Sequence, residues 1–146
     1  MSIEVSYVVF SLDAYNKVGI DSLLGYVIES PQPNIAPVNV PGPFTFIVNI
    51  MLIGLEENEG CSLRFIIGKE NELVIDTGEM VIPAGQNIED NHIPKELKPR
   101  FINFKLYDVP FQSEGEHTYN VIINGDVKKI GKFGVFQIPR GDINGQ

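Results

Sequence analysis

The sequence is poor in the residues that most often mark a functional class. It contains one cysteine, Cys61, so no disulfide bond can form within the chain. Small secreted domains usually depend on disulfides, and we therefore expect a reducing, cytoplasmic location. The 146 residues include no tryptophan, three arginines and two histidines. Few side chains are left from which a metal centre or a phosphate-binding surface could be built.

Charge of one sign dominates the chain. The formal net charge is −8, and the sole basic cluster consists of Lys128, Lys129 and Lys132. Because nucleic acid and anionic membranes are themselves negative, we expect the chain to bind neither.

Long hydrophobic runs are also missing. The longest apolar stretch, Phe44–Leu55, is too short to cross a bilayer and contains Asn49 and Gly54, so it predicts a buried central strand. The first residues carry no positive charge before Glu4, and we expect no signal peptide.

What the sequence does contain is β-strand patterning. Apolar and polar side chains alternate through most of residues 101–138, as a strand with one buried face requires. The pair Asn124-Gly125 separates two such runs and predicts a tight hairpin turn, because both of its residues tolerate positive φ. The 14 glycines and 10 prolines fall mainly between apolar runs and predict turns. The predicted fold is all-β, a single antiparallel, immunoglobulin-like β-sandwich of seven to nine strands with little helix.

The expected strands form one domain, residues 1–139, followed by a flexible C-terminal tail, residues 140–146. They are expected at Ile3–Leu12, Leu23–Glu29, Pro43–Ile53, Cys61–Gly68, Leu73–Ile82, Phe101–Val109, His117–Asn124 and Val127–Ile138. We expect the fourth strand to pair with the third, and the fifth to be interrupted at 76–78. Five prolines within residues 30–43 predict an extended connection from one sheet to the other, since proline cannot donate to a β-ladder.

Three features of the sequence resemble the DUF6941 family of small bacterial proteins of unknown function. They are the segment Gly19–Tyr26 after the first strand, the proline-rich loop and apolar strand of Pro37–Ile53, and the Gly-x-x-x-Tyr-x-Val motif with its tight turn in Gly115–Gly125. The polar insertion around Gly85–Arg100 departs from that pattern. The resemblance implies a β-sandwich and assigns no catalytic residues.

Catalytic and metal-binding motifs are not found in the sequence. It has no nucleophile elbow, Walker loop or dinucleotide fingerprint. Cys61 opens an apolar strand and is expected to be a buried structural thiol. We expect His117 to face solvent or a turn, whereas His92 would need metal ligands from elsewhere in the chain. The acidic run Glu56–Gly60 lacks the ligand spacing of a calcium loop and predicts a solvated turn. We therefore expect a non-enzyme with no cofactor.

Two pairs of phenylalanines suggest an interface. Phe101 and Phe104 lie three residues apart in one predicted strand, as do Phe133 and Phe136 in another. In a regular strand, residues three apart face opposite sides, so one member of each pair would be exposed. A bulge, or a strand buried on both sides, would remove that exposure. We take these four residues as the candidate interface, because exposed aromatic side chains often mark one.

These observations leave two functional hypotheses. The first is a non-catalytic interaction or assembly module that acts through a protein partner or by self-association, most simply as a homodimer. The second is a protein that binds a nucleotide or sugar with the loops 30–43 and 85–100, since loops on a rigid β scaffold commonly carry binding sites.

Overall fold

The computed structural model describes residues 3–56, apart from 17–25, together with 58–84 and 99–139. Nine strands and no helix occur in these residues. The strands are β1 (Glu4–Asn16), β2 (Tyr26–Pro31), β3 (Gly42–Ile53), β4 (Cys61–Lys69), β5 (Glu72–Asp76), β6 (Met80–Ile82), β7 (Pro99–Phe111), β8 (Gly115–Ile123) and β9 (Asp126–Val135). The all-β prediction and the expected strand number are confirmed.

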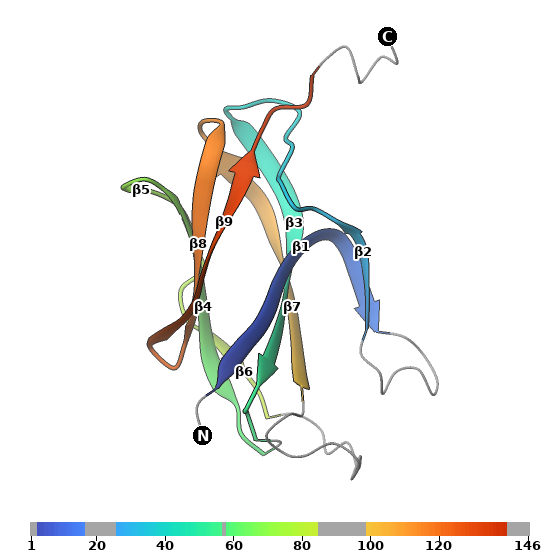
Figure 1. The fold of residues 1–146 in the computed structure, drawn as a ribbon, viewed down its shortest axis with the longest axis vertical. Helices are drawn as coiled ribbons and strands as arrows, with labels where there is room; N and C mark the ends of the chain where they lie inside the picture. The colour runs from blue at the N-terminus through green and yellow to red at the C-terminus, as the bar shows by residue number, and fades with distance from the viewer. Residues whose placement is uncertain (1–2, 17–25, 57, 85–98, 140–146) are drawn as a thin grey trace.

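The strands form two antiparallel sheets that pack face to face (Figure 1). Sheet A is four-stranded, in the order β2-β1-β3-β7. Sheet B is five-stranded, in the order β5-β4-β8-β9, with β6 also paired to β4. The architecture is a β-sandwich, and the finer prediction of an immunoglobulin-like arrangement stays a prediction.

Local sequence signals are reproduced where they depend on neighbouring residues. Asn124 and Gly125 both have positive φ, 50° and 85°, as the predicted tight turn between β8 and β9 requires. On β4 the alternate residues Leu63, Phe65 and Ile67 are all fully buried, as the period of two predicts. The predicted interruption at 76–78 is also present, because β5 ends at Asp76 and β6 begins at Met80.

Two predictions of connectivity are wrong. β4 does not pair with β3: the chain crosses to sheet B after Ile53, and β4 pairs with β8. The proline-rich connection does not end in the other sheet, since both β2 and β3 belong to sheet A. It reaches across to sheet B at Ile35, which forms a parallel bridge with Val135, and then returns. Turn residues specify where a chain changes direction but not which sheet it enters next.

The core between the sheets is centred on an aromatic cluster. The ring of Phe10 lies 5.1 Å from Phe46, 6.2 Å from Phe65, 5.7 Å from Tyr119 and 5.0 Å from Phe133, measured between centroids. All four contacts have the edge-to-face geometry that aromatic pairs favour. Because these rings come from both sheets, their contacts stabilise the packing of one sheet against the other.

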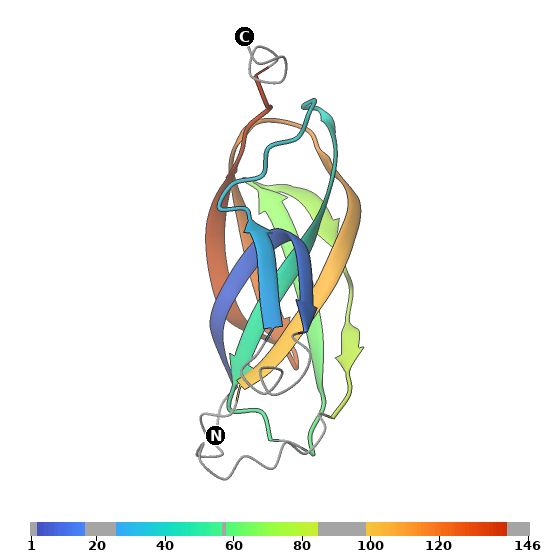
Figure 2. The ribbon, with the colours of Figure 1, turned by 90° about the vertical axis from the view of Figure 1, so that its right-hand side faces the viewer.

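The second half of β1 turns away from β3 and forms a hairpin with β2, within sheet A. β1 pairs with β3 as far as Ser11 and with β2 from Ser11 onward. Figure 2, which turns the right-hand side of Figure 1 toward the viewer, shows this hairpin lying outside β3. On that outer face Ser11 and Asn49 are fully buried, and the Asn49 Nδ2 donates to the Val9 carbonyl (2.9 Å) and to the Ser11 Oγ (2.8 Å). The bend of β1 opens the side of the sandwich where β1 faces β9.

Several sequence-based predictions concern residues outside the described ranges. The segment 19–25, most of the loop 85–100, His92 and the tail 140–146 belong to this group. Within the described residues, no helix is long and apolar enough to span a membrane.

Candidate functional site

The four phenylalanines of the candidate interface do not share a surface. Phe104 and Phe133 point into the core, where the Phe104 ring lies 5.7 Å from that of Phe65, and Phe133 is 6% exposed. Phe101 lies half-buried on the outer face of β7 in sheet A, whereas Phe136 follows β9 and is 51% exposed. The alternation argument holds within each pair, but the outward members belong to different sheets. The four residues therefore do not form one continuous surface, and the contact of Phe101 or Phe136 with a partner stays a prediction.

An apolar surface is instead found on the outer face of sheet B. Ile122 pairs directly with Val127, and Asn120 lies between Ile66 and Ile130 in the register. We name Ile66, Ile122, Val127 and Ile130 the sheet-B apolar face. Val127 is 55% and Ile130 62% exposed, although both are large aliphatic residues. An exposed apolar surface of this kind is typical of an interaction site.

Charged side chains on the same face of sheet B are paired with each other. Arg64 binds Asp76 through two hydrogen bonds, one of them from Nε to Oδ1 at 2.9 Å. Lys132 and Glu116 form a more exposed ion pair at 3.5 Å. These pairs limit the repulsion that this face would present to an approaching molecule.

The Arg64–Asp76 pair gives the protein a defined acid sensitivity. Hydrogen bonds from the Arg64 guanidinium, and then from the Gly78 amide, lower the pKa of Asp76 from 3.8 to about 2. Between these pH values the unfolded chain binds more protons at this group than the folded chain does, so stability falls as the pH falls. We expect the stability difference between wild type and Asp76→Asn to be complete above pH 3.8 and to vanish near pH 2, as measured by urea denaturation.

Asp126→Asn, which changes an exposed aspartate at the start of β9, is the matched control. It leaves the Arg64–Asp76 pair intact, so the contribution of that pair to the stability profile should remain. If Asp76→Asn and the wild type had the same free energy of unfolding at every pH, the Arg64–Asp76 pair would not be the source of the acid sensitivity.

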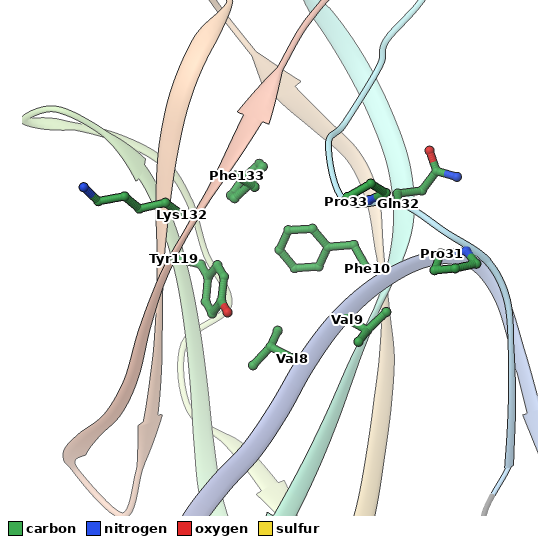
Figure 3. Close-up of a pocket in the computed structure, with 9 residues that line it drawn as sticks. All are labelled: Val8, Val9, Phe10, Pro31, Gln32, Pro33, Tyr119, Lys132 and Phe133. Carbon is green, nitrogen blue, oxygen red and sulfur yellow. The ribbon is translucent and has the colours of Figure 1, made fainter.

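A pocket lies between the two sheets, on the side where β1 bends away from β3 (Figure 3). We name it the β1–β9 pocket, and its volume is about 430 Å³. It is lined by Val8, Val9, Phe10, Pro31, Gln32, Pro33, Tyr119, Lys132 and Phe133. A volume of this size falls within the range of pockets that bind small ligands or single large side chains.

The walls of the β1–β9 pocket are mostly apolar. In Figure 3 the rings of Phe10, Phe133 and Tyr119 converge from β1, β9 and β8, while the ammonium end of Lys132 points away from Phe10. Pro31 and Pro33 close the opposite side. Burial raises the pKa of the Tyr119 hydroxyl, so it stays a neutral hydrogen-bonding group. The pocket walls therefore suit an apolar or aromatic group.

His117 is not a surface residue, and the expectation that it faces solvent is wrong. Its side chain is 1% exposed and packs against Phe111 and Phe133, with ring centroids 5.5 and 5.6 Å away. The Nδ1 lies 3.0 Å from the Gly115 carbonyl, and burial lowers the pKa of the imidazole. Its alternation with Tyr119 and Val121 was the sequence signal for an inward position. His117 acts here as a core residue.

Cys61 and the acidic turn, the other candidates considered from the sequence, both lie in contacts that hold the fold together. Cys61 is buried, and burial raises the pKa of its thiol despite the nearby charge of Arg100. Arg100 also donates to the carbonyls of Glu56, Glu59 and Pro83, so it holds the acidic turn against β7. Among the residues that the structure describes, no group of three or more His, Cys, Asp or Glu side chains is arranged to hold a metal ion.

Comparison with known proteins gives no family. No protein-family model matches the chain, and no curated protein matches it. Among solved structures, the chain is similar to the Pseudomonas fluorescens alkylpurine DNA glycosylase AlkC bound to DNA containing an abasic site analog, at a TM-score of 0.49 and 9% identity. That match covers 92% of this chain and 30% of the glycosylase.

A β-glucosidase from Listeria innocua in complex with glucose is also similar, at a TM-score of 0.39 and 11% identity. The match covers 89% of this chain and 16% of the glucosidase. The chain thus spans less than a third of each of these proteins. These likenesses are too weak to carry over an activity.

Proposed function

We propose that this chain is a non-catalytic interaction module that self-associates through the sheet-B apolar face. The observation that supports the proposal is the exposure of Val127 and Ile130 beside Ile66 and Ile122 on one sheet surface. Covering these side chains would remove apolar area from water, at about 25 cal/mol per Å². The resemblance to the DUF6941 family is compatible with this role and adds no activity.

Charge supports a second copy as the partner on this face. The chain carries a net charge of −8, which opposes self-association at most of its surface. On the outer face of sheet B, however, Arg64 is paired with Asp76, and Lys132 forms an exposed ion pair with Glu116. A twofold dimer brings the same patch of each copy together, which suits a flat apolar surface with internally paired charges.

Substitution of Ile130 by glutamate tests the proposal. We expect the wild type to have about twice the 16.2 kDa monomer mass in light scattering. Ile130→Glu should weaken the dimer by about a hundredfold, since a twofold interface would bury the new carboxylate twice. Val38→Glu is the matched control, because Val38 is 60% exposed against 62% for Ile130 and lies outside this face. A wild type that is monomeric at every concentration tested contradicts the proposal.

A second candidate function is the binding of a nucleotide or sugar. It is favoured by the β1–β9 pocket, to which the loop 30–43 contributes Pro31, Gln32 and Pro33. The aromatic rings of the pocket could stack on a base or a sugar ring. Thermal-shift screening against nucleotides and sugars separates this candidate from the first, since a ligand at about a hundred times its dissociation constant adds roughly 2.7 kcal/mol of stability.

A further inference from the structure

The edge of β9 is covered along only part of its length. The segment after β2 runs parallel to the end of β9: Ile35 N–H donates to the Gly134 carbonyl (2.9 Å), and Phe136 N–H donates to the Ile35 carbonyl (3.0 Å). Ile138 N–H continues this ladder to the Pro37 carbonyl (3.0 Å), and the Asn34 side chain accepts from Gly134 N–H (2.9 Å). Within the described part of the chain, no strand pairs with this edge before Gly134.

Proline explains why the ladder stops there. Ile35 donates to Gly134, so two residues earlier Pro33 would have to donate to Lys132, and proline has no N–H. Gln32 turns instead toward sheet A, where its N–H donates to the Phe10 carbonyl at 2.7 Å. Along the chain, Gln32 therefore lies beside β1, and the pairing with β9 begins only after Pro33.

The uncovered part of β9 presents a row of backbone groups. Gly134 and Phe136 direct their backbone groups to this edge, and the direction alternates along a strand with a period of two. Lys132 and Ile130 accordingly direct theirs to the same edge. Such a row is the template to which an extended chain adds as a further strand.

The β1–β9 pocket opens directly beside this edge. Lys132 and Phe133 of β9 line it on one side, and Val8 and Phe10 of β1 on the other. A strand added to the edge of β9 directs alternate side chains toward the space between the sheets. At about 430 Å³, the pocket can take one large apolar side chain from that strand.

Charge indicates which strand fits. The densest basic cluster of the sequence, Lys128, Lys129 and Lys132, lies on β9 in a chain of net charge −8. Lysines on an edge discourage pairing between two copies of that edge, because like charges would face each other. They attract a strand that carries carboxylates. Lys132 also forms an ion pair with Glu116, but both side chains are more than two-thirds exposed, so a carboxylate of the added strand can replace Glu116. A second copy is thus disfavoured at this edge, and an acidic segment of another protein is favoured.

We propose that an extended acidic peptide of a partner protein adds to the edge of β9 and inserts a large apolar side chain into the β1–β9 pocket. This inference rests on the proposed function of an interaction module but uses the backbone edge of β9, whereas the proposed dimer uses the side chains of the sheet-B apolar face. Backbone hydrogen bonds to Ile130 and Lys132 would supply affinity, and the pocket and lysines would supply specificity.

Random nine-residue peptides displayed on phage test the inference against the immobilised full chain. We expect enrichment of peptides with one large apolar residue flanked by aspartate or glutamate. A synthetic, fluorescein-labelled copy of the enriched peptide should bind in an anisotropy titration, and replacing its apolar residue by serine should weaken binding at least about tenfold. Absence of enrichment, or enrichment of basic peptides, overturns the inference.

Variants of β9 then separate the edge from the sheet face. Ile130→Pro removes the edge-directed N–H and should abolish binding of the labelled peptide, whereas Ile130→Thr keeps the N–H and should bind within about threefold of wild type. Far-UV circular dichroism confirms that each variant is folded. Equal binding by Ile130→Pro and Ile130→Thr would refute addition at the edge.

Charge reversal provides a second, independent variant. Lys129→Glu with Lys132→Glu should weaken peptide binding at least about tenfold, and Lys105→Glu on sheet A should leave it unchanged. Light scattering on the wild type reports the dimer separately, so a monomeric wild type that binds the peptide rejects the proposed dimer alone. A pocket that binds a nucleotide or sugar but selects no peptide rejects this inference and supports the second candidate function.

Discussion

Phe46→Ala is expected to lower the free energy of unfolding by about 3–5 kcal/mol, the usual cost of truncating a buried phenylalanine. Phe46 is 1% exposed, and its ring contacts Phe10, Phe44 and Phe111 at centroid distances of 5.1, 6.0 and 6.3 Å. The surrounding rings come from β1, β3 and β7 and cannot collapse far into the space left behind. Urea denaturation followed by circular dichroism measures the change.

Phe136→Ala is the matched control, since it removes the same atoms from a side chain that is 51% exposed. It should cost less than about 1 kcal/mol, because little apolar area would be returned to water. Equal losses from both variants would mean that Phe46 is not the core residue described above.

Gly131→Ala is expected to destabilise the protein by about 1–3 kcal/mol, although alanine normally suits a strand better than glycine does. The Tyr119 ring lies over Gly131 of the neighbouring strand, and a Cβ at this position would overlap the ring and its hydroxyl. The ring is held from its other sides by Phe65 and Phe10, each with a centroid 5.7 Å away, so it cannot move aside freely.

A double-mutant cycle isolates this contact. In the Tyr119→Ala background the new methyl group meets no ring, so Gly131→Ala should become nearly neutral there. We expect a coupling free energy of at least about 1 kcal/mol between the two positions, obtained from four denaturation curves. Additive effects would show that the cost at Gly131 comes from the backbone rather than from Tyr119.

The features that the sequence predicted well depend on residues close together in the chain. The tight turn needs only Asn124 and Gly125, whose φ values of 50° and 85° few other residue pairs tolerate. The inward face of β4 needs only the alternation of Leu63, Phe65 and Ile67. Such signals are encoded within a few residues, so no knowledge of the rest of the fold is needed.

The features that it missed depend on contacts between distant residues. β4 could not be assigned to sheet B from its own pattern, because a strand with one buried face fits either sheet. The four phenylalanines show the same limit. The sequence predicted that the two members of each pair face opposite sides of their strand, but it did not predict where in the sandwich Phe101 and Phe136 lie. A pairing pattern over the whole chain would have been required.

The candidate site combines both situations. The lysines of β9 and the prolines before β3 are visible in the sequence as a basic cluster and a proline-rich loop. Lys132, Pro31 and Pro33 come together beside Phe10 because β1 bends after Ser11. Residues of β1, of β9 and of the proline-rich loop then line one pocket. The alternation of apolar residues in β8 indicated that His117 faces inward. Its position near the start of the strand suggested a surface residue, and that suggestion was wrong.

The short parallel ladder between Ile35 and the end of β9 has a consequence for synthesis of the chain. Ile35 is fully buried, and it is hydrogen-bonded to residues that emerge from the ribosome a hundred positions later. Until Gly134 and Phe136 have been synthesised, Ile35 lacks the backbone hydrogen bonds that hold it in place, and the hydrophobic core lacks one of its buried residues. The sandwich therefore closes late, as folds built on contacts of large sequence separation do, and its nascent chain carries exposed apolar surface for most of translation.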